Sequence, residues 1–223
     1  MSARQRTSRS PGRVLKVDPR KPDPGAIARA AELIRAGGVV CYPTRCLYGL
    51  GADARNAAAV EKVFALKQRP ATMALLVLIH RPEEMAGLAA RIPRLARALM
   101  DRFWPGRLTI VLEAAEGLPA PLTAGTGKIG IRLAGHPVAS ALVSAFGGPI
   151  TGTSANLSGS PGCVEIPGLD PGIRNGVDLV LDAGRLKGGV GSTVVDVTGE
   201  KPVVIREGEV PKAEILAVAK EIG

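Results

Sequence analysis

Apolar positions along the chain follow two patterns, one typical of buried strands and one typical of amphipathic helices. Short apolar runs predict strands at 38–42, 74–79, 108–113, 129–133, 149–151, 177–181, 193–197 and 202–206. Apolar positions at helical spacing, between Asn or Pro starts and Gly or Pro ends, predict helices at 24–36, 57–67, 82–91, 93–102, 137–146 and from 211 onward. Neither an internal repeat nor a charged linker divides the chain.

The segment 38–70 carries the densest cluster of chemically useful side chains. Its first strand, 38–42, is apolar throughout, which is typical of a strand covered on both faces. We expect Pro43, Gly49 and Gly51 to end regular structure. The polar side chains that follow the strand are then carried on a loop at its carboxyl end, where open α/β sheets bind ligands, and they are Thr44, Arg45, Cys46 and Tyr48.

Two cations, Lys67 and Arg69, follow the helix that Asn56 is expected to cap and that Pro70 ends. They have two interpretations. Cations near the carboxyl end of a helix interact favourably with its dipole, which requires no ligand. The same pair also suits one half of a clamp for a polyphosphate, provided that other segments supply matching groups.

Those matching groups occur on two later loops and on two strands. Residues 152–159 are rich in small and hydroxylated side chains, including Gly152, Ser154 and Asn156. They fit an ordinary Ser/Asn turn, or a loop whose backbone N–H groups and short donors wrap an anion. A second glycine-rich bend, 188–192, delivers Ser192 to a strand. Arg132 lies on the strand 129–133, where the alternative is an ordinary residue of the sheet surface, and Arg206 lies at the end of the strand 202–206.

The net charge of +9 is concentrated near the N-terminus, because the first 21 residues hold seven basic residues and one acid, Asp18. We expect residues 1–17 to form a basic, disordered tail that solubilises the protein or attracts RNA loosely, and 18–223 to form the domain. Only six aromatic residues are present, which argues against a stacking platform for single-stranded nucleic acid.

Three cysteines without a Cys-x-x-Cys pair fit a reducing cytoplasm, and two histidines make a zinc site improbable. No apolar run is long enough for membrane insertion, so neither secretion nor a membrane is expected. The glycine patterns at 49–54 and 125–130 lack the strand-then-helix context of dinucleotide sites. Cys46 beside Arg45 suggests a lowered thiol pKa, but no base is placed to make it a nucleophile.

A set of cations and neutral donors without a nucleophile suits nucleotidyl transfer, in which positioning and charge stabilisation carry most of the catalysis. Six sequence blocks occur along the chain in the following order: YPTRCLYGLG followed by KQRP, FWPGRLTIVL, IGIRL with HPVA, TSANLSG, GSTVVD, and VVIREG. Together they resemble the YrdC/Sua5/YciO family, and in particular its threonylcarbamoyl-AMP synthases without an extra C-terminal domain. The resemblance runs from about Asp18 to Gly208.

The resemblance implies a single α/β domain, a twisted open mixed sheet with flanking helices and a positively charged concave face. It implies that L-threonine, bicarbonate and ATP condense to threonylcarbamoyl-AMP and pyrophosphate, with magnesium accompanying ATP and no dedicated protein metal ligands. Partner proteins would pass the product to adenosine 37 of ANN-reading tRNAs. It places the ATP site at Lys67, Arg69, Gly152, Ser154, Asn156, Gly162 and Arg206, with Lys67 and Arg69 catalytic. It places the threonine pocket at Thr44, Cys46, Arg132 and Ser192.

Some residues depart from the family's usual pattern. Arg45-Cys46 stands where an acid and a threonine are usual, Met73-Ala74 follows KQRP, and Lys128 replaces a frequent threonine. They motivate two alternatives. One is a YciO-like paralogue that binds double-stranded RNA or tRNA with little or no synthase activity, and the other is adenylation of a different carbamoyl compound.

Overall fold

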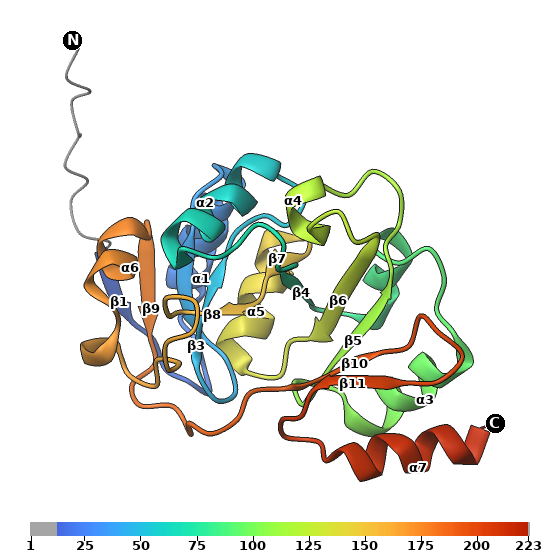
Figure 1. Cartoon of the computed structure of the whole chain (residues 1–223). Coiled ribbons are helices and arrows are strands. Elements are labelled where there is room, and N and C mark those ends of the chain that lie inside the picture. Colours follow the sequence, from blue (N-terminus) through green and yellow to red (C-terminus); the bar gives the residue numbers. More distant parts are fainter. Residues whose placement is uncertain (1–12, 223) are drawn as a thin grey trace.

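Strands from distant parts of the chain pair into two mixed sheets in the computed structural model, which describes residues 13–222 (Figure 1). One sheet has the order β1 (Arg13–Lys16), β9 (Leu179–Asp182), β2 (Val40–Pro43), β3 (Tyr48–Gly51) and β8 (Thr153–Ser154). The other has the order β11 (Val203–Arg206), β10 (Thr193–Asp196), β5 (Leu108–Glu113), β6 (Lys128–Leu133), β4 (Leu76–Ile79) and β7 (Ile150–Thr151). The expected α/β class is confirmed, but hydrogen bonding divides the strands between two mixed sheets where a single sheet was expected.

The helices flank these sheets, and most begin where the sequence predicts. They are α1 (Pro24–Arg35), α2 (Ala57–Lys67), α3 (Arg94–Phe103), α4 (Ala120–Thr123), α5 (Pro137–Phe146), α6 (Pro171–Gly176) and α7 (Lys212–Ile222), with 3-10 turns at Pro82–Gly87 and Ile166–Gly168. Asp23 caps α1 by accepting a hydrogen bond from the Ala26 amide at 2.7 Å, and Asn56 caps α2 in the same way at Ala59.

The helix predicted at 82–91 is wrong beyond its first turns, because the chain leaves the helical path to join a strand. The Leu88 and Ala89 amides both donate to the carbonyl of Met85, and the Ala90 amide already donates to the carbonyl of Glu113 on β5. Pairing with the end of a strand thus replaces the last predicted turns. Residues 160–176 contain two short helical segments with Ile166 and Ile173 buried.

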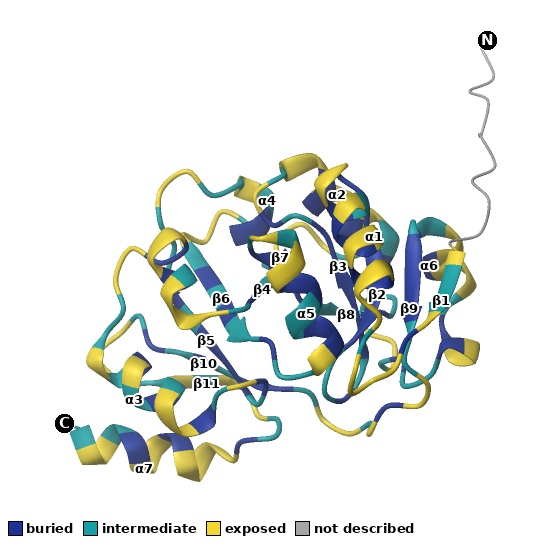
Figure 2. Ribbon diagram, turned by 180° about the vertical axis from the view of Figure 1, so that it is seen from behind, coloured by how far each residue is buried: buried dark blue, intermediate teal, exposed yellow. Residues whose placement is uncertain are grey.

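Strand β2 is buried on both faces, as its apolar sequence predicts. Val40 and Tyr42 belong to the hydrophobic cluster under α1 and α5, whereas Cys41 belongs to the cluster on the opposite face, which also contains residues of α2. Figure 2 shows α1 and α5 covering this part of the molecule from behind, and the two helices are in contact. Two covering layers fix β2 and therefore the loop that leaves it.

The prediction that Gly49 and Gly51 end regular structure is wrong, because both lie in β3, which pairs antiparallel with β2. Close packing explains the glycines. A Cβ on Gly51 would lie 2.8 Å from the ring of Tyr42, and a Cβ on Gly49 would lie 3.2 Å from the Thr153 carbonyl oxygen. Tyr48 consequently starts a strand, and only residues 44–47 form the loop.

The N-terminal boundary of the folded domain lies earlier than expected. Residues Arg13–Lys16 form β1, which pairs parallel with β9 at the edge of the first sheet, so this part of the expected tail belongs to the domain. The remainder of that expected tail, 1–12, lies outside the described residues. Within residues 13–222, no helix combines the length and apolar content that a membrane span requires.

Candidate functional site

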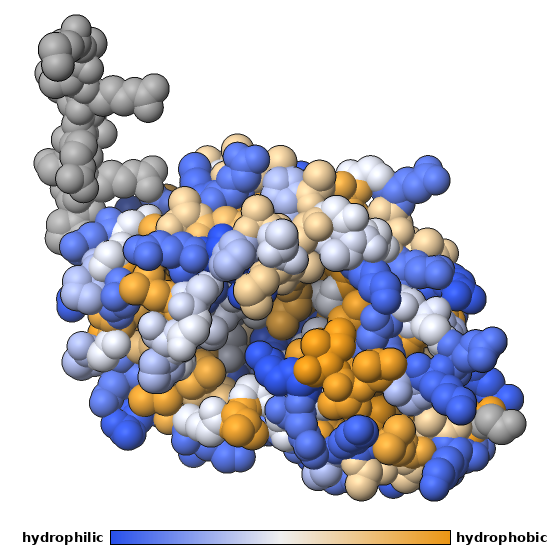
Figure 3. Space-filling model, in the orientation of Figure 1, coloured by the Kyte–Doolittle hydropathy of each residue, from blue (hydrophilic) through white to orange (hydrophobic). Residues whose placement is uncertain are grey.

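A cavity of about 550 Å³ opens between the two sheets, and residues of both sheets line it. Figure 3 shows the molecule hollowed between the two sheets, with an apolar patch beside the hollow over the C-terminal strands. The structure brings eight of the predicted site residues to its wall: Thr44, Cys46, Arg69, Arg132, Gly152, Ser154, Ser192 and Arg206. The other three, Lys67, Asn156 and Gly162, are not among the lining residues.

Lys67 lies under the loop that begins with β8. Its side chain is 1% exposed, and its ammonium group donates to the backbone carbonyls of Ser154 at 2.5 Å and Asn156 at 2.7 Å. Burial, with the nearby charge of Arg69 as a smaller cause, lowers the pKa of Lys67 to about 8. Lys67 therefore shapes the loop from below, while the loop itself reaches the cavity.

Asn156 also shapes this loop. Its side-chain amide donates to the carbonyls of Leu157 at 2.7 Å and Ser160 at 2.8 Å. Gly162 permits a close contact nearby, because a Cβ there would lie 2.5 Å from a methyl group of Leu47, which does line the cavity. The three predicted residues outside the wall thus have contacts that position residues on it.

Arg69 and Arg206 supply positive charge to the cavity. The Arg69 guanidinium donates to the carbonyls of Met73 and Ala74, both at 2.9 Å, which fixes its direction. Burial, and then the positive charge of Arg206, lower the pKa of Arg69. Arg206 in turn donates to the Ser192 carbonyl at 2.7 Å. Two guanidinium groups that influence one another at the wall of a cavity suit a polyanion such as a triphosphate.

Arg132 and Ser192 form a second polar centre in the same cavity. The Arg132 guanidinium donates to the Ser192 hydroxyl at 2.8 Å, and that hydroxyl also bonds the Thr109 hydroxyl at 2.8 Å. Thr44 donates its hydroxyl to the Leu47 carbonyl at 2.6 Å, which fixes the loop after β2. A guanidinium presents five donors in a fork, so Arg132 can bind a carboxylate in addition to Ser192.

The expected lowering of the Cys46 thiol pKa is wrong. Burial raises the pKa, and the negative charge of Glu209 raises it further, while Arg45 opposes these effects. Cys46 is only 4% exposed, and Arg45 is engaged by Glu209 with contacts of 3.0 and 3.2 Å. The cation that would stabilise a thiolate is therefore already paired.

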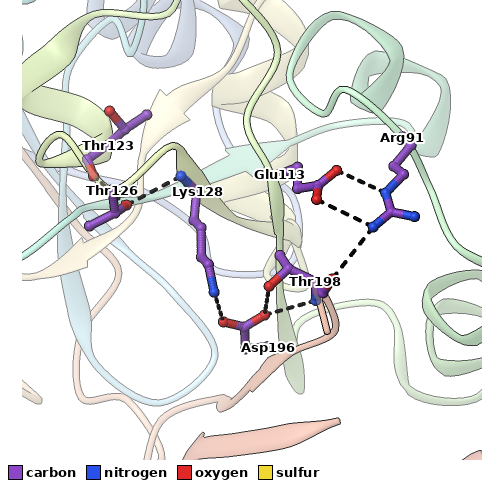
Figure 4. A network of polar contacts seen from close by, with 7 residues as sticks. All are labelled: Arg91, Glu113, Thr123, Thr126, Lys128, Asp196 and Thr198. Atoms are coloured by element: carbon purple, nitrogen blue, oxygen red, sulfur yellow. Dashed lines mark hydrogen bonds and ion pairs between the residues drawn. The ribbon is translucent and has the colours of Figure 1, made fainter. Parts of the chain in front are cut away.

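Sequence reasoning missed two carboxylates of the cavity wall, Asp196 and Glu209. Asp196 accepts from the Lys128 ammonium at 2.7 Å and from the Thr198 hydroxyl at 2.7 Å, as Figure 4 shows. Asp196 ends the strand that starts beside Ser192, which is a signal that sequence reasoning could have used. Glu209 carries no comparable signal, because only the path of the chain after β11 brings it to the cavity.

Within the part of the chain that the structure describes, no group of three or more His, Cys, Asp or Glu side chains is placed to hold a metal ion. His136 has a structural contact, since its ring nitrogen accepts from the Val138 amide at the start of α5.

A comparison with protein families matches residues 32–208 to the Sua5_yciO_yrdC model, described as "Telomere recombination". The chain belongs to the Sua5/YciO/YrdC family. It is 38% identical over 193 residues to the threonylcarbamoyl-AMP synthase of Pyrococcus abyssi, covering 86% of this chain but only 57% of that relative. The corresponding enzyme of Halorhodospira halophila is 36% identical over 185 residues, covering 83% of this chain and 91% of the relative.

Solved structures of the family have the same fold. Sua5 of P. abyssi complexed with L-threonine matches with a TM-score of 0.86 and 36% identity, over 92% of this chain and 60% of that one. YciO of E. coli matches with a TM-score of 0.81 and 30% identity, over 92% of this chain and 98% of that one. The described domain of this Sua5/YciO/YrdC protein therefore corresponds to part of the longer Sua5 chain and to nearly all of YciO.

Proposed function

We propose that this protein is an L-threonylcarbamoyladenylate synthase. One observation carries the proposal: a single cavity joins a cationic wall, with Arg69 and Arg206, to a neighbouring polar centre at Arg132 and Ser192. A nucleotide triphosphate and an amino acid can occupy these two parts of one cavity together. The synthase names of the P. abyssi and H. halophila relatives support the same reaction.

In the proposed reaction, the amine of L-threonine attacks bicarbonate and water leaves, which gives a carbamate. A carbamate oxygen then attacks the α-phosphorus of ATP. The bond between the α-phosphorus and the oxygen that bridges to the β-phosphorus breaks, which releases pyrophosphate. The protein's task is to position two anions against each other and to stabilise the charge on the phosphates.

We assign the triphosphate to Arg69, Arg206 and the loop that starts at Gly152 and Ser154. Lys67 and Asn156 hold that loop through its backbone carbonyls, and Lys67 adds positive charge beneath it. Gly152 lets the backbone approach the second sheet, since a Cβ there would lie 2.4 Å from a Leu76 methyl group. Magnesium would arrive with the ATP phosphates, in keeping with its preference for phosphate oxygens and water.

We assign the threonine carboxylate to Arg132, which Ser192 orients by its 2.8 Å hydrogen bond. Thr44 and Cys46 form the adjoining wall. The product would pass to partner proteins that modify adenosine 37 of tRNA. We place the reaction in the cytoplasm, where the free cysteines Cys41, Cys46 and Cys163 suit a reducing compartment.

The test is release of pyrophosphate from ATP, with threonine and bicarbonate omitted in turn. We expect release to require both, and to fall at least tenfold in Arg132→Gln. Arg91→Gln is the control, because the Arg91 guanidinium is paired with Glu113 and does not line the cavity. Release that is independent of both substrates would refute the proposal.

The alternative of a YciO-like RNA-binding protein is favoured by the close fit to E. coli YciO, together with the Arg45-Cys46 departure. It predicts salt-dependent binding of double-stranded RNA or tRNA without turnover. A panel of other amino acids in the same pyrophosphate assay tests the third possibility, adenylation of a different carbamoyl compound.

A further inference from the structure

Two carboxylates stand among the cations of the described cavity wall, and they differ in availability. The cations are Arg45, Arg69, Lys128, Arg132 and Arg206. Asp196 is occupied by the Lys128 ammonium and by the backbone and hydroxyl of Thr198 (Figure 4). Glu209 lies at the other polar centre, close enough to Arg132 and Cys46 for its charge to affect the pKa of both.

The backbone of Glu209 is held firmly against the bend that carries Ser192. Its amide donates to the Gly191 carbonyl at 3.0 Å, and its carbonyl accepts from Arg107 at 3.2 Å. The preceding Gly208 packs so closely that a Cβ would lie 2.3 Å from the Gly191 carbonyl oxygen. The carboxylate is therefore presented from a rigid segment, and its side chain is only 12% exposed.

Arg45 holds the carboxylate group itself. Its guanidinium makes two contacts to Glu209, and its aliphatic stem crosses Gly106 and Gly135. A Cβ on Gly106 would lie 2.3 Å from the Arg45 Cδ, and a Cβ on Gly135 would lie 3.0 Å from it. Two glycines thus form a slot that fits this arginine, so the pair is built into the wall.

The pair leaves Glu209 able to accept further hydrogen bonds. A carboxylate has about four acceptor sites, and the two Arg45 contacts together with the Cys46 thiol use about three of them, which leaves about one for a ligand. Lys187 is 3.9 Å away and is exposed, so its contribution is weak. Arg45 holds the pKa of Glu209 below its usual range, and the carboxylate is charged at neutral pH.

A fixed carboxylate near a half-buried guanidinium matches a zwitterion, whose ammonium and carboxylate groups lie on the same carbon. We propose that Glu209 is a specificity-determining residue that receives the α-ammonium group of the amino acid whose carboxylate binds Arg132. This inference rests on the proposed function and adds a requirement to it: the ligand must carry a free amine. A 2-hydroxy acid of the same shape offers no charge to Glu209.

The experiment measures binding to the full chain by calorimetry, with L-threonine and with its 2-hydroxy analogue, 2,3-dihydroxybutyrate of matching configuration. In Glu209→Gln we expect threonine to bind roughly 10- to 100-fold more weakly, the range for one charged hydrogen bond, while the hydroxy acid changes by less than about threefold. Glu113→Gln, which breaks an exposed bidentate Arg–Glu pair outside the cavity, should leave both unchanged.

Arg45→Gln separates a ligand contact from a purely structural pair. It keeps the Glu209 carboxylate but removes the group that orients it, so threonine should bind up to about tenfold more weakly while the hydroxy acid changes by less than about threefold. If the pair only maintains the fold, Arg45→Gln and Glu209→Gln will weaken both ligands alike, which overturns the proposal. If Glu209→Gln folds poorly because Arg45 is left unpaired, the double variant Arg45→Gln/Glu209→Gln is used instead. Its affinities for threonine and for the hydroxy acid are then compared with those of the wild type.

Failure of the proposed function gives a different result. If the wild-type protein binds neither ligand and releases no pyrophosphate with threonine, both the synthase function and the role of Glu209 are refuted. If the wild type is active with threonine but Glu209→Gln weakens the binding of threonine and of the hydroxy acid equally, only the role of Glu209 is refuted.

Discussion

Replacing Lys67 with methionine tests whether this residue acts through the loop above it. The change removes two hydrogen bonds from a charged donor and leaves the Ser154 and Asn156 carbonyls without that partner. Leaving a buried acceptor unsatisfied costs about 1–3 kcal/mol, so the two together cost about 2–6 kcal/mol. Against this, the ammonium is itself costly to bury. Its pKa falls from 10.5 to about 8, which corresponds to about 3 kcal/mol.

The two effects nearly cancel, so Lys67→Met should lower the free energy of unfolding by only about 1–2 kcal/mol in chemical denaturation. The loop, by contrast, loses both of its anchors. We expect faster hydrogen exchange over residues 153–158 and an ATP affinity at least about tenfold weaker by calorimetry. Lys62→Met is the matched control, because Lys62 lies on the same helix and donates one bond, to the Gly37 carbonyl at 2.6 Å.

The reasoning is refuted if Lys67→Met leaves ATP affinity within twofold of the wild type and loop exchange unchanged. Weakened ATP binding with an unchanged exchange rate would also contradict it, because that combination indicates an ammonium that contacts the nucleotide without shaping the loop.

Four further predictions follow from the contacts of Lys67, Gly152 and Ser192. ATP affinity should fall as pH rises through about 8, by up to about tenfold per pH unit, because Lys67 loses its proton there; Lys67→Arg should abolish this dependence in calorimetry. Since the folded-state pKa of Lys67 lies below its unfolded value, its contribution to stability rises between pH 8 and 10.5, and denaturation at several pH values checks this sign. Gly152→Ala should cost about 1–3 kcal/mol of unfolding free energy, whereas Gly168→Ala, which has nothing within 4 Å of the added Cβ, should be nearly neutral. Ser192→Ala should weaken threonine binding by about five- to tenfold, because Arg132 loses the acceptor that orients it; unchanged affinity would contradict this.

The sequence alone determined the elements whose signals are local. Helix starts at Asp23 and Asn56 depend on side chains that cap amides three residues ahead, and both were predicted. The apolar run of β2 indicated burial on both faces because every one of its positions is apolar. Residue type, together with the resemblance to the family, pointed to eight of the residues that line the cavity, including Arg69 and Arg132.

Tertiary structure alone decided what depends on distant neighbours. From the sequence, Gly49 and Gly51 were predicted to end regular structure. Inside the folded strand, however, the Tyr42 ring and the Thr153 carbonyl lie so close that only glycine fits at these positions. From the sequence, Lys67 was predicted to contact phosphate. The two carbonyls that its ammonium group binds lie nearly ninety residues later in the chain, so no nearby residue indicates the direction of its side chain. Glu209 reaches the cavity because the path of the chain after β11 brings it there, where it pairs with Arg45, 164 positions earlier. Local capping and periodicity can be read from neighbouring residues, whereas close approach and ion pairing arise only when the chain folds back on itself.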